Sequence, residues 1–284
     1  MAHIREIKKR IKVAQNIQQI TRAMAMVAAV RLRRTQEKVF AARPYTERLA
    51  ALLSNAAPDR TEESHPLFAP RSVVANVLLV PITADKGLCG SFNSNIVRRT
   101  AATIGQMPRA KVALYPLGKK GYDYFRRVNA PMAGYRLNLV RAPKLREAAS
   151  VAQWLAESFL SGQYDEVHIV YNRFVSAAHQ VVEVEKFLPI SLPRAEGREA
   201  GPITEPSRRA ALDALAEEWI KSRMYHYVLE ASAGELGARR TAMDAATDNA
   251  SEIIASQTLA LNRARQNAIT MEILDIINGA EAMK

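Results

Sequence analysis

Two long stretches at the ends of the chain have the 3-4 hydrophobic spacing of amphipathic helices. Residues 1–43 and 238–278 contain neither Gly nor Pro. At a rise of about 1.5 Å per residue, each stretch predicts a helix of roughly 60 Å, several times the usual length. The first pattern meets Pro44 and resumes beyond it, while the second begins at Arg208, after the start signal Pro206-Ser207. Gly234 and Gly237 are weak points in this second helix.

The middle of the chain has a different pattern, in which short β-branched runs alternate with helical ones. The predicted strands are Val73–Ile82, Lys111–Tyr115, Arg136–Val140, Glu166–Tyr171 and Gln180–Phe187. The predicted helices are Ser94–Ile104, Lys119–Arg127 and Leu145–Leu160. This alternation predicts a Rossmann-like α/β domain with a largely parallel sheet. The segment from His179 to Glu185 alternates best and predicts an edge strand, on which Glu183 and Glu185 are expected to be solvated.

The predicted organisation is therefore an α/β domain inserted between two long helices, at 1–55, 70–205 and 208–284. If both helices leave the same side of the domain, they form an antiparallel coiled coil, because 3-4 spacing is sustained along both. The expected seam is Ile4, Ile7, Ile11, Ala14, Ile17, Ile20, Met24 and Val27 in the first helix. In the last helix it is Met243, Ala246, Ala250, Ile253, Gln257, Ala260, Ala264, Asn267, Met271 and Leu274.

The end of the chain carries a second apolar face. Ile269, Ile273, Ile276, Ile277 and Ala280 cluster on one wall of the predicted helix, nearly opposite the last seam residues. One partner helix cannot bury both faces. The wall therefore predicts an interface with another protein, although a lone helical hairpin with a filled isoleucine core remains an alternative.

Composition and charge narrow the class of protein. The 284 residues are 48% hydrophobic and 24% charged, as in folded soluble proteins. We expect no signal peptide, and the longest apolar run, Val73–Ile82, is too short to span a membrane. Of the net charge of +12, residues 1–43 carry eleven Lys and Arg against two Glu, 11 − 2 = +9. Nucleic acid, an anionic membrane or an acidic protein could each be the partner of this arm.

Candidate chemistry is sparse. The segment Thr83–Asn93 follows the first predicted strand, where α/β proteins place active sites, but its order Lys86-Gly87 does not match a P-loop. A cysteine enzyme using Cys89 is an alternative, since His65, His168 and His179 are available as bases; a structural tight turn is favoured. The five histidines form no metal-ligand pattern. A basic coiled coil that binds nucleic acid is a second alternative, disfavoured because no aromatic residues interleave with Arg31, Arg33 and Arg34.

Several long motifs resemble the gamma subunit of the F-type (F1Fo) ATP synthase of bacteria. At the C-terminus these are Ile269-Thr270-Met271-Glu272 through Asp275 and Gly279-Ala280-Glu281-Ala282, with Ala242–Ala250 upstream. At the N-terminus they are Ile7–Ile11 and Gln18–Ala28, and in the centre Asp85-Lys86-Gly87-Leu88-Cys89-Gly90. The likeness covers the whole chain, strongly at the termini and weakly from about 100 to 205.

The resemblance implies a central rotor shaft that is not itself an enzyme and holds no cofactor. Its implied partners are a ring of three alpha and three beta subunits, the epsilon subunit and the c-subunit ring, with no nucleic acid. It implies peripheral association with the cytoplasmic face of the bacterial inner membrane. Arg265, Gln266, Arg33 and Arg34 correspond to beta-subunit contacts, the tip at Ile269, Ile273, Ile276 and Ile277 to a part held in a hydrophobic sleeve, and Glu205 loosely to the rotor foot.

Overall fold

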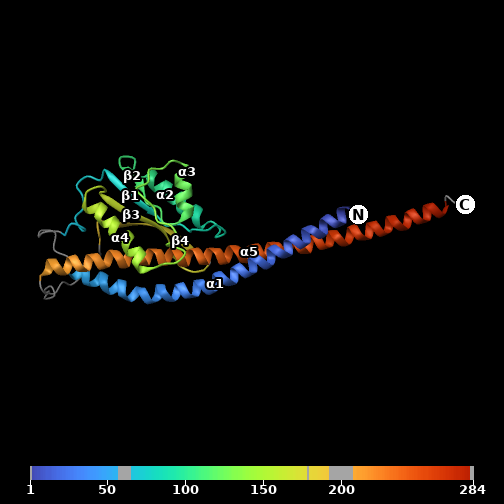
Figure 1. The fold of residues 1–284 in the computed structure, drawn as a ribbon, viewed down its shortest axis with the longest axis horizontal. Helices are drawn as coiled ribbons and strands as arrows, with labels where there is room; N and C mark the ends of the chain where they lie inside the picture. The colour runs from blue at the N-terminus through green and yellow to red at the C-terminus, as the bar shows by residue number, and fades with distance from the viewer. Residues whose placement is uncertain (1, 57–64, 178, 192–206, 282–284) are drawn as a thin grey trace. The chain divides into compact units, whose positions relative to one another are not determined.

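A computed structural model describes residues 2–56, 65–177, 179–191 and 207–281. Along the chain the elements are α1 (Ala2–Ala56), β1 (Asn76–Pro81), α2 (Phe92–Gly105), β2 (Lys111–Leu114), α3 (Lys119–Arg127), α4 (Leu145–Leu160), β3 (Glu166–Phe174), β4 (Gln180–Leu188) and α5 (Arg208–Glu281) (Figure 1). The chain divides into two compact units, one made of Met1–Ala28 with Arg240–Lys284 and the other of Ala29–Arg239. The predicted fold class, an α/β domain between two long helices, is confirmed.

The sheet has four strands in the order β2-β1-β3-β4. Strand β1 pairs in parallel with β2 and β3, while β4 is antiparallel to β3 and forms an edge, as its alternation predicted. The prediction of a strand at Arg136–Val140 is wrong. Only an isolated bridge from Leu117 to Arg136 forms there, because the positive φ of Asn138 turns the backbone away from the sheet.

Alternate residues of β1 enter two different cores of the larger unit. Leu78 and Val80 pack with α4 and with the parts of α1 and α5 that belong to this unit. Val77 and Leu79 point to the opposite face, where α2 and α3 cover them. The sheet is therefore a central layer with helices on both faces, as a buried parallel sheet requires.

Helix α5 approaches the sheet and the turn between β3 and β4 closely at Gly234 and Gly237. A Cβ on Gly234 would lie 3.3 Å from the Phe92 ring, and one on Gly237 would lie 2.9 Å from the carbonyl oxygen of Ala177. The helix continues through both positions. The residues expected to weaken it are thus points of close packing.

In the smaller unit, the two helices pair as an antiparallel coiled coil. The hydroxyls of Thr21 and Thr247 are 2.7 Å apart, and Gln18 Nε2 donates to Ser251 Oγ at 2.8 Å. From one of these pairs to the other, the residue number rises in one helix and falls in the other, so the two helices are antiparallel. The seam residues of α1 in this unit follow one unbroken heptad spacing: Ile4, Ile7, Ile11, Ala14, Gln18, Thr21, Ala25 and Ala28.

The predicted seam is correct at some positions and wrong at others. Ile17, Ile20 and Val27 are 47–59% exposed, because the heptad continues through the polar Gln18 and Thr21 and not through the next apolar residues. In α5 the seam is Met243, Thr247, Ala250, Ile254, Gln257, Leu261, Ala264 and Ala268. One seam residue in each heptad agrees with the prediction. The other seam residue lies one position later than predicted, so Ile253, Ala260 and Asn267 face outward.

Candidate functional site: the apolar helix end and its basic surroundings

The end of α5 continues beyond the N-terminal end of α1. Thr21 lies opposite Thr247, and Gln18 lies opposite Ser251. Continued back to the start of α1, this antiparallel register ends at about residue 267 of α5. Residues 269–281 of α5 therefore have no partner helix beside them among the described residues. At about 1.5 Å per residue, these 13 residues extend roughly 20 Å.

The side chains of this extension are apolar and exposed. The four predicted tip residues, Ile269, Ile273, Ile276 and Ile277, are 47%, 52%, 72% and 52% exposed. Met271 and Leu274, which we predicted to lie in the seam, are also exposed, because α1 ends before it reaches them. No described residue of the chain thus covers either apolar face of this helix end. Such a concentration of large exposed apolar side chains marks an interface.

A second exposed apolar surface runs along the coiled coil. Val13, Ile17 and Ile20 on α1 and Ile253 on α5 are each about half exposed. All of them except Ile20 line a groove between the two helices, together with Glu6, Lys9, Arg10, Ala14 and Gln257. Its charged residues are mostly basic, so an apolar surface with an acidic rim would complement it.

The predicted contact residues fall in both units. Arg265 and Gln266 lie exposed on α5 in the smaller unit, just before the extension. Arg33 and Arg34 lie exposed on α1 in the larger unit, where Arg33 pairs with Glu37 at 3.5 Å. Both members of that pair are mostly exposed, so water screens the pair and it contributes little to stability. Each unit therefore presents exposed polar groups. Glu205 lies outside the described residues.

The turn around Cys89 is built from buried contacts. Cys89 is 1% exposed, and Asn93 Nδ2 donates to its sulfur at 3.2 Å. Asn93 Oδ1 accepts from the backbone N–H of Ala84 at 2.8 Å, and Arg239 Nη1 donates to the carbonyl oxygen of Gly87 at 2.7 Å. Burial, followed by the negative charge of Glu235, raises the pKa of the Cys89 thiol. A thiol that is buried and slow to ionise is a poor nucleophile.

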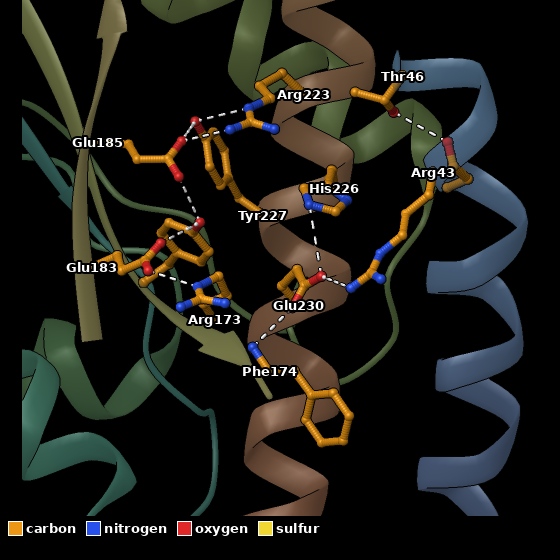
Figure 2. Close-up of polar contacts among 12 residues, drawn as sticks. Arg43, Thr46, Arg173, Phe174, Glu183, Glu185, Arg223, His226, Tyr227 and Glu230 are labelled. Atoms are coloured by element: carbon orange, nitrogen blue, oxygen red, sulfur yellow. Dashed lines mark hydrogen bonds and ion pairs between the residues drawn. The ribbon is translucent and has the colours of Figure 1, made fainter. Parts of the chain in front are cut away.

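A polar network at Glu185 was not predicted, since we expected this carboxylate to be solvated. Glu185 accepts hydrogen bonds from the hydroxyls of Tyr171 at 2.8 Å and Tyr227 at 2.6 Å, and from Arg223 at 2.6 Å (Figure 2). Burial alone would raise the pKa of Glu185, but these donors outweigh it and the pKa is lowered. The network ties α5 to β3 and β4. A second unpredicted carboxylate, that of Glu230 on α5, is more deeply buried than Glu185.

The described ranges contain neither a metal site nor a membrane-spanning helix. No group of three or more His, Cys, Asp or Glu side chains is placed there to hold a metal ion. No described helix has an apolar run long enough to cross a bilayer.

Known proteins resemble the chain over its whole length. A family model described as ATP synthase matches residues 3–283. ATP synthase gamma chains from Moorella thermoacetica and Desulfitobacterium hafniense are 43% and 42% identical over 284 residues, with 100% of each chain covered. A chain of the central stalk and c ring of the Tetrahymena thermophila mitochondrial ATP synthase is 28% identical with a TM-score of 0.62, covering 80% of this chain and 99% of that one. A chain of the Euglena gracilis mitochondrial ATP synthase has a TM-score of 0.71 at 20% identity, covering 99% and 95%, and shares the fold.

Proposed function

The chain belongs to the ATP synthase gamma family, whose members are non-catalytic rotor shafts, and from this premise we propose how its surfaces act. The exposed end of α5 turns inside a hydrophobic sleeve formed by three alpha and three beta subunits. The observation that carries this proposal is the apolar extension, whose six large side chains from Ile269 to Ile277 are 45–72% exposed. Water makes such a surface unfavourable, and an enclosing apolar ring would remove it from water.

The remaining partners follow from the same role. The shaft is peripheral to a membrane complex, and its α/β domain contacts the epsilon subunit and the c-subunit ring, which drives rotation. The full-length relatives from Moorella thermoacetica and Desulfitobacterium hafniense support a bacterial type of complex, at the cytoplasmic face of the inner membrane. Glu205 is proposed to lie in the rotor foot near the c ring.

Two pairs of polar residues are proposed to contact the beta subunits. Arg265 and Gln266 offer guanidinium and amide donors beside the tip, and both are exposed. Arg33 and Arg34 offer a fixed positive charge on α1, which suits an acidic lever of a beta subunit. Arg33 is held by only one exposed ion pair at 3.5 Å, so little energy opposes its exchange for a partner carboxylate.

The shaft acts by giving each beta subunit a different contact surface. A ligand or partner shifts a conformational equilibrium only by interacting differently with the two states. The two helices of the smaller unit carry different side chains around their circumference, and one side carries the groove lined by Val13, Ile17 and Ile253. Rotation of this asymmetric surface therefore biases each beta subunit in turn between nucleotide binding and release.

Deleting residues 269–284 tests the proposed bearing. The full chain and the shortened chain are each expressed with the alpha and beta subunits. We expect the full chain to co-purify with six larger nucleotide-binding subunits, and the shortened chain to show weaker assembly or lower torque. Thermal unfolding of the larger unit serves as the control and is expected to be unchanged. Assembly and ATP synthesis at the full chain's level after the deletion would contradict the sleeve.

Replacing Arg265 and Gln266 together with Ala tests the beta-subunit contact. Turnover of the assembled complex is expected to fall. The matched control is Arg263→Ala, which removes another exposed arginine of α5. At about 100° per residue, Arg263 points about 160° away from Arg265 around the helix. Equal turnover in the double variant and the control would remove the assignment of these two residues.

A further inference from the structure

Glu230 is a buried carboxylate at the junction of three elements. Its side chain is 3% exposed, within an apolar stretch of α5. Its Oε2 accepts the backbone N–H of Phe174, at the end of β3, at 2.8 Å. Its Oε1 lies 3.5 Å from Arg43 Nη2 on α1 and 3.6 Å from His226 Nε2 one turn earlier on α5 (Figure 2).

Stability alone does not account for a carboxylate in this position. A buried ion pair stabilises a fold no better than well-packed apolar side chains of the same volume in many cases. Apolar residues already join α1 and α5 around it, since Leu32 and Val39 pack against Leu229, Ala233 and Leu236. A leucine at position 230 would extend that packing, so the carboxylate supplies something that packing does not.

The carboxylate supplies contacts whose strength depends on the relative orientation of the elements that they join. Apolar packing is non-directional, so packed helices can turn or slide against one another by small shifts. Hydrogen bonds weaken steeply when their angles change. Because one carboxylate is bonded to β3 and paired with α1, turning either element about α5 changes the geometry of a buried contact. Thr46 and Ser222, whose hydroxyls lie 3.1 Å apart, add a second polar contact between α1 and α5.

The network at Glu185 fixes α5 to the sheet from another side. Arg223 and Tyr227 of α5 both donate to Glu185 on β4 at 2.6 Å. This network does not include α1. Among the residues in these two networks, Glu230 is the one bonded both to the sheet and to α1 (Figure 2).

We infer that Glu230 is a positioning residue that makes the sheet, α1 and α5 turn as one body. The inference rests on the proposed function, because it concerns torque that enters at the α/β domain and leaves along the two helices. Without the buried carboxylate, the domain would still fold around its apolar cores. It would twist further against the helices under the same torque.

The test measures torsional stiffness in the assembled rotary complex. A bead is attached through cysteines introduced at Arg99 and Arg127, both exposed on the α/β domain, and its angular fluctuation is recorded during the pauses of ATP-driven rotation. Glu230→Gln keeps an acceptor for Phe174 but removes the negative charge. Glu217→Gln is the matched control, since Glu217 is an exposed glutamate of the same helix.

We expect the angular variance of Glu230→Gln to rise by about twofold or more, because the charge that pairs with Arg43 and His226 is lost while the acceptor for Phe174 stays. The control is expected to keep the wild-type variance. A purely structural role would lower the yield or melting temperature without widening the fluctuation of the complexes that assemble. Wild-type variance in assembled Glu230→Gln complexes overturns the inference.

A second pair of variants keeps the test decisive if Glu230→Gln does not assemble. Arg43→Met removes the α1 partner of Glu230, from a side chain that is 45% exposed, together with the guanidinium that lies 5.3 Å over the Phe40 ring. Arg43→Lys restores the charge. We expect Arg43→Met to widen the fluctuation and Arg43→Lys to return it towards wild type. Equal variance in these two variants and wild type overturns the inference. Failure of the wild-type chain to assemble or rotate would instead contradict the proposed function.

Discussion

Gly234 and Gly237 of α5 offer a matched test of how closely the helix packs on the sheet. Alanine at either position gains the same helix propensity, about 1 kcal/mol relative to glycine. The surroundings differ. The added Cβ at 234 would meet the edge of the Phe92 ring at 3.3 Å, whereas at 237 it would meet the backbone carbonyl oxygen of Ala177 at 2.9 Å.

The nature of the neighbour decides the sign of each effect. An aromatic ring can rotate by a few tenths of an ångström, so Gly234→Ala should be neutral or stabilise by up to about 1 kcal/mol. The Ala177 carbonyl also accepts a hydrogen bond from Gln180 Nε2 at 3.0 Å, so it cannot move away freely. Overpacking costs typically about 1–3 kcal/mol. After the gain in propensity, Gly237→Ala should destabilise by about 1 kcal/mol.

Urea and thermal unfolding of the full chain, followed by circular dichroism, measure both variants. A change of 1 kcal/mol shifts the melting temperature of a domain of this size by about 2–4 °C. Gly237→Ala is expected to melt at least that far below Gly234→Ala. If the two variants melt together, or in the reverse order, the close approach of α5 to Ala177 is not what limits residue 237.

Three further predictions concern other parts of the chain. Gly118→Ala should destabilise the larger unit by about 3 kcal/mol or more in urea unfolding, because the residue has φ +96° and its Cβ would lie 2.0 Å from the Thr83 carbonyl oxygen; a loss below about 1 kcal/mol would contradict this. Replacing Thr21 and Thr247 by Val one at a time should each cost about 0.5–1 kcal/mol, and the double variant should cost less than the sum; strict additivity in the double-mutant cycle would show that the hydroxyls do not interact. Burial lowers the pKa of His65, whose Nδ1 accepts a backbone N–H at 3.1 Å, so folding favours the neutral ring. Stability should therefore decline as the pH falls from 6.5 through the lower folded pKa, and His65→Gln should flatten this dependence; an unchanged slope would sink the assignment.

Local patterns predicted most of the secondary structure. The bounds of α3 and α4 and the start of α5 agree with the sequence to the residue, because turn residues and apolar spacing mark these ends. Pro44 does not end α1, which continues to Ala56. Tertiary contacts hold the helix on both sides of it, since Val39 and Leu49 are both buried. Local propensity yields to such packing.

The coiled-coil seam shows what the sequence of one helix, taken without its partner, cannot specify. In α5, apolar residues fit both a spacing of three then four residues and a spacing of four then three. Met243, Ala250 and Gln257 belong to both spacings and were predicted correctly, whereas the seam residues between them were predicted one position too early. The choice depends on the partner helix. Glu185 and Glu230 were missed for a related reason, since a charged side chain becomes buried only when distant donors such as Tyr171 or Phe174 reach it.

The paired hydroxyls of Thr21 and Thr247 have a consequence for how the two helices choose their alignment. A shift of one helix by seven residues would keep the heptad spacing of the two seams matched. It would also place Thr247 opposite Ala14 or Ala28, which offer no partner for its hydroxyl. This polar layer thus favours one alignment of the seam over its heptad-shifted alternatives, as one buried polar residue can do in other coiled coils. By fixing this alignment, the pair determines how many residues of α5 extend beyond the start of α1.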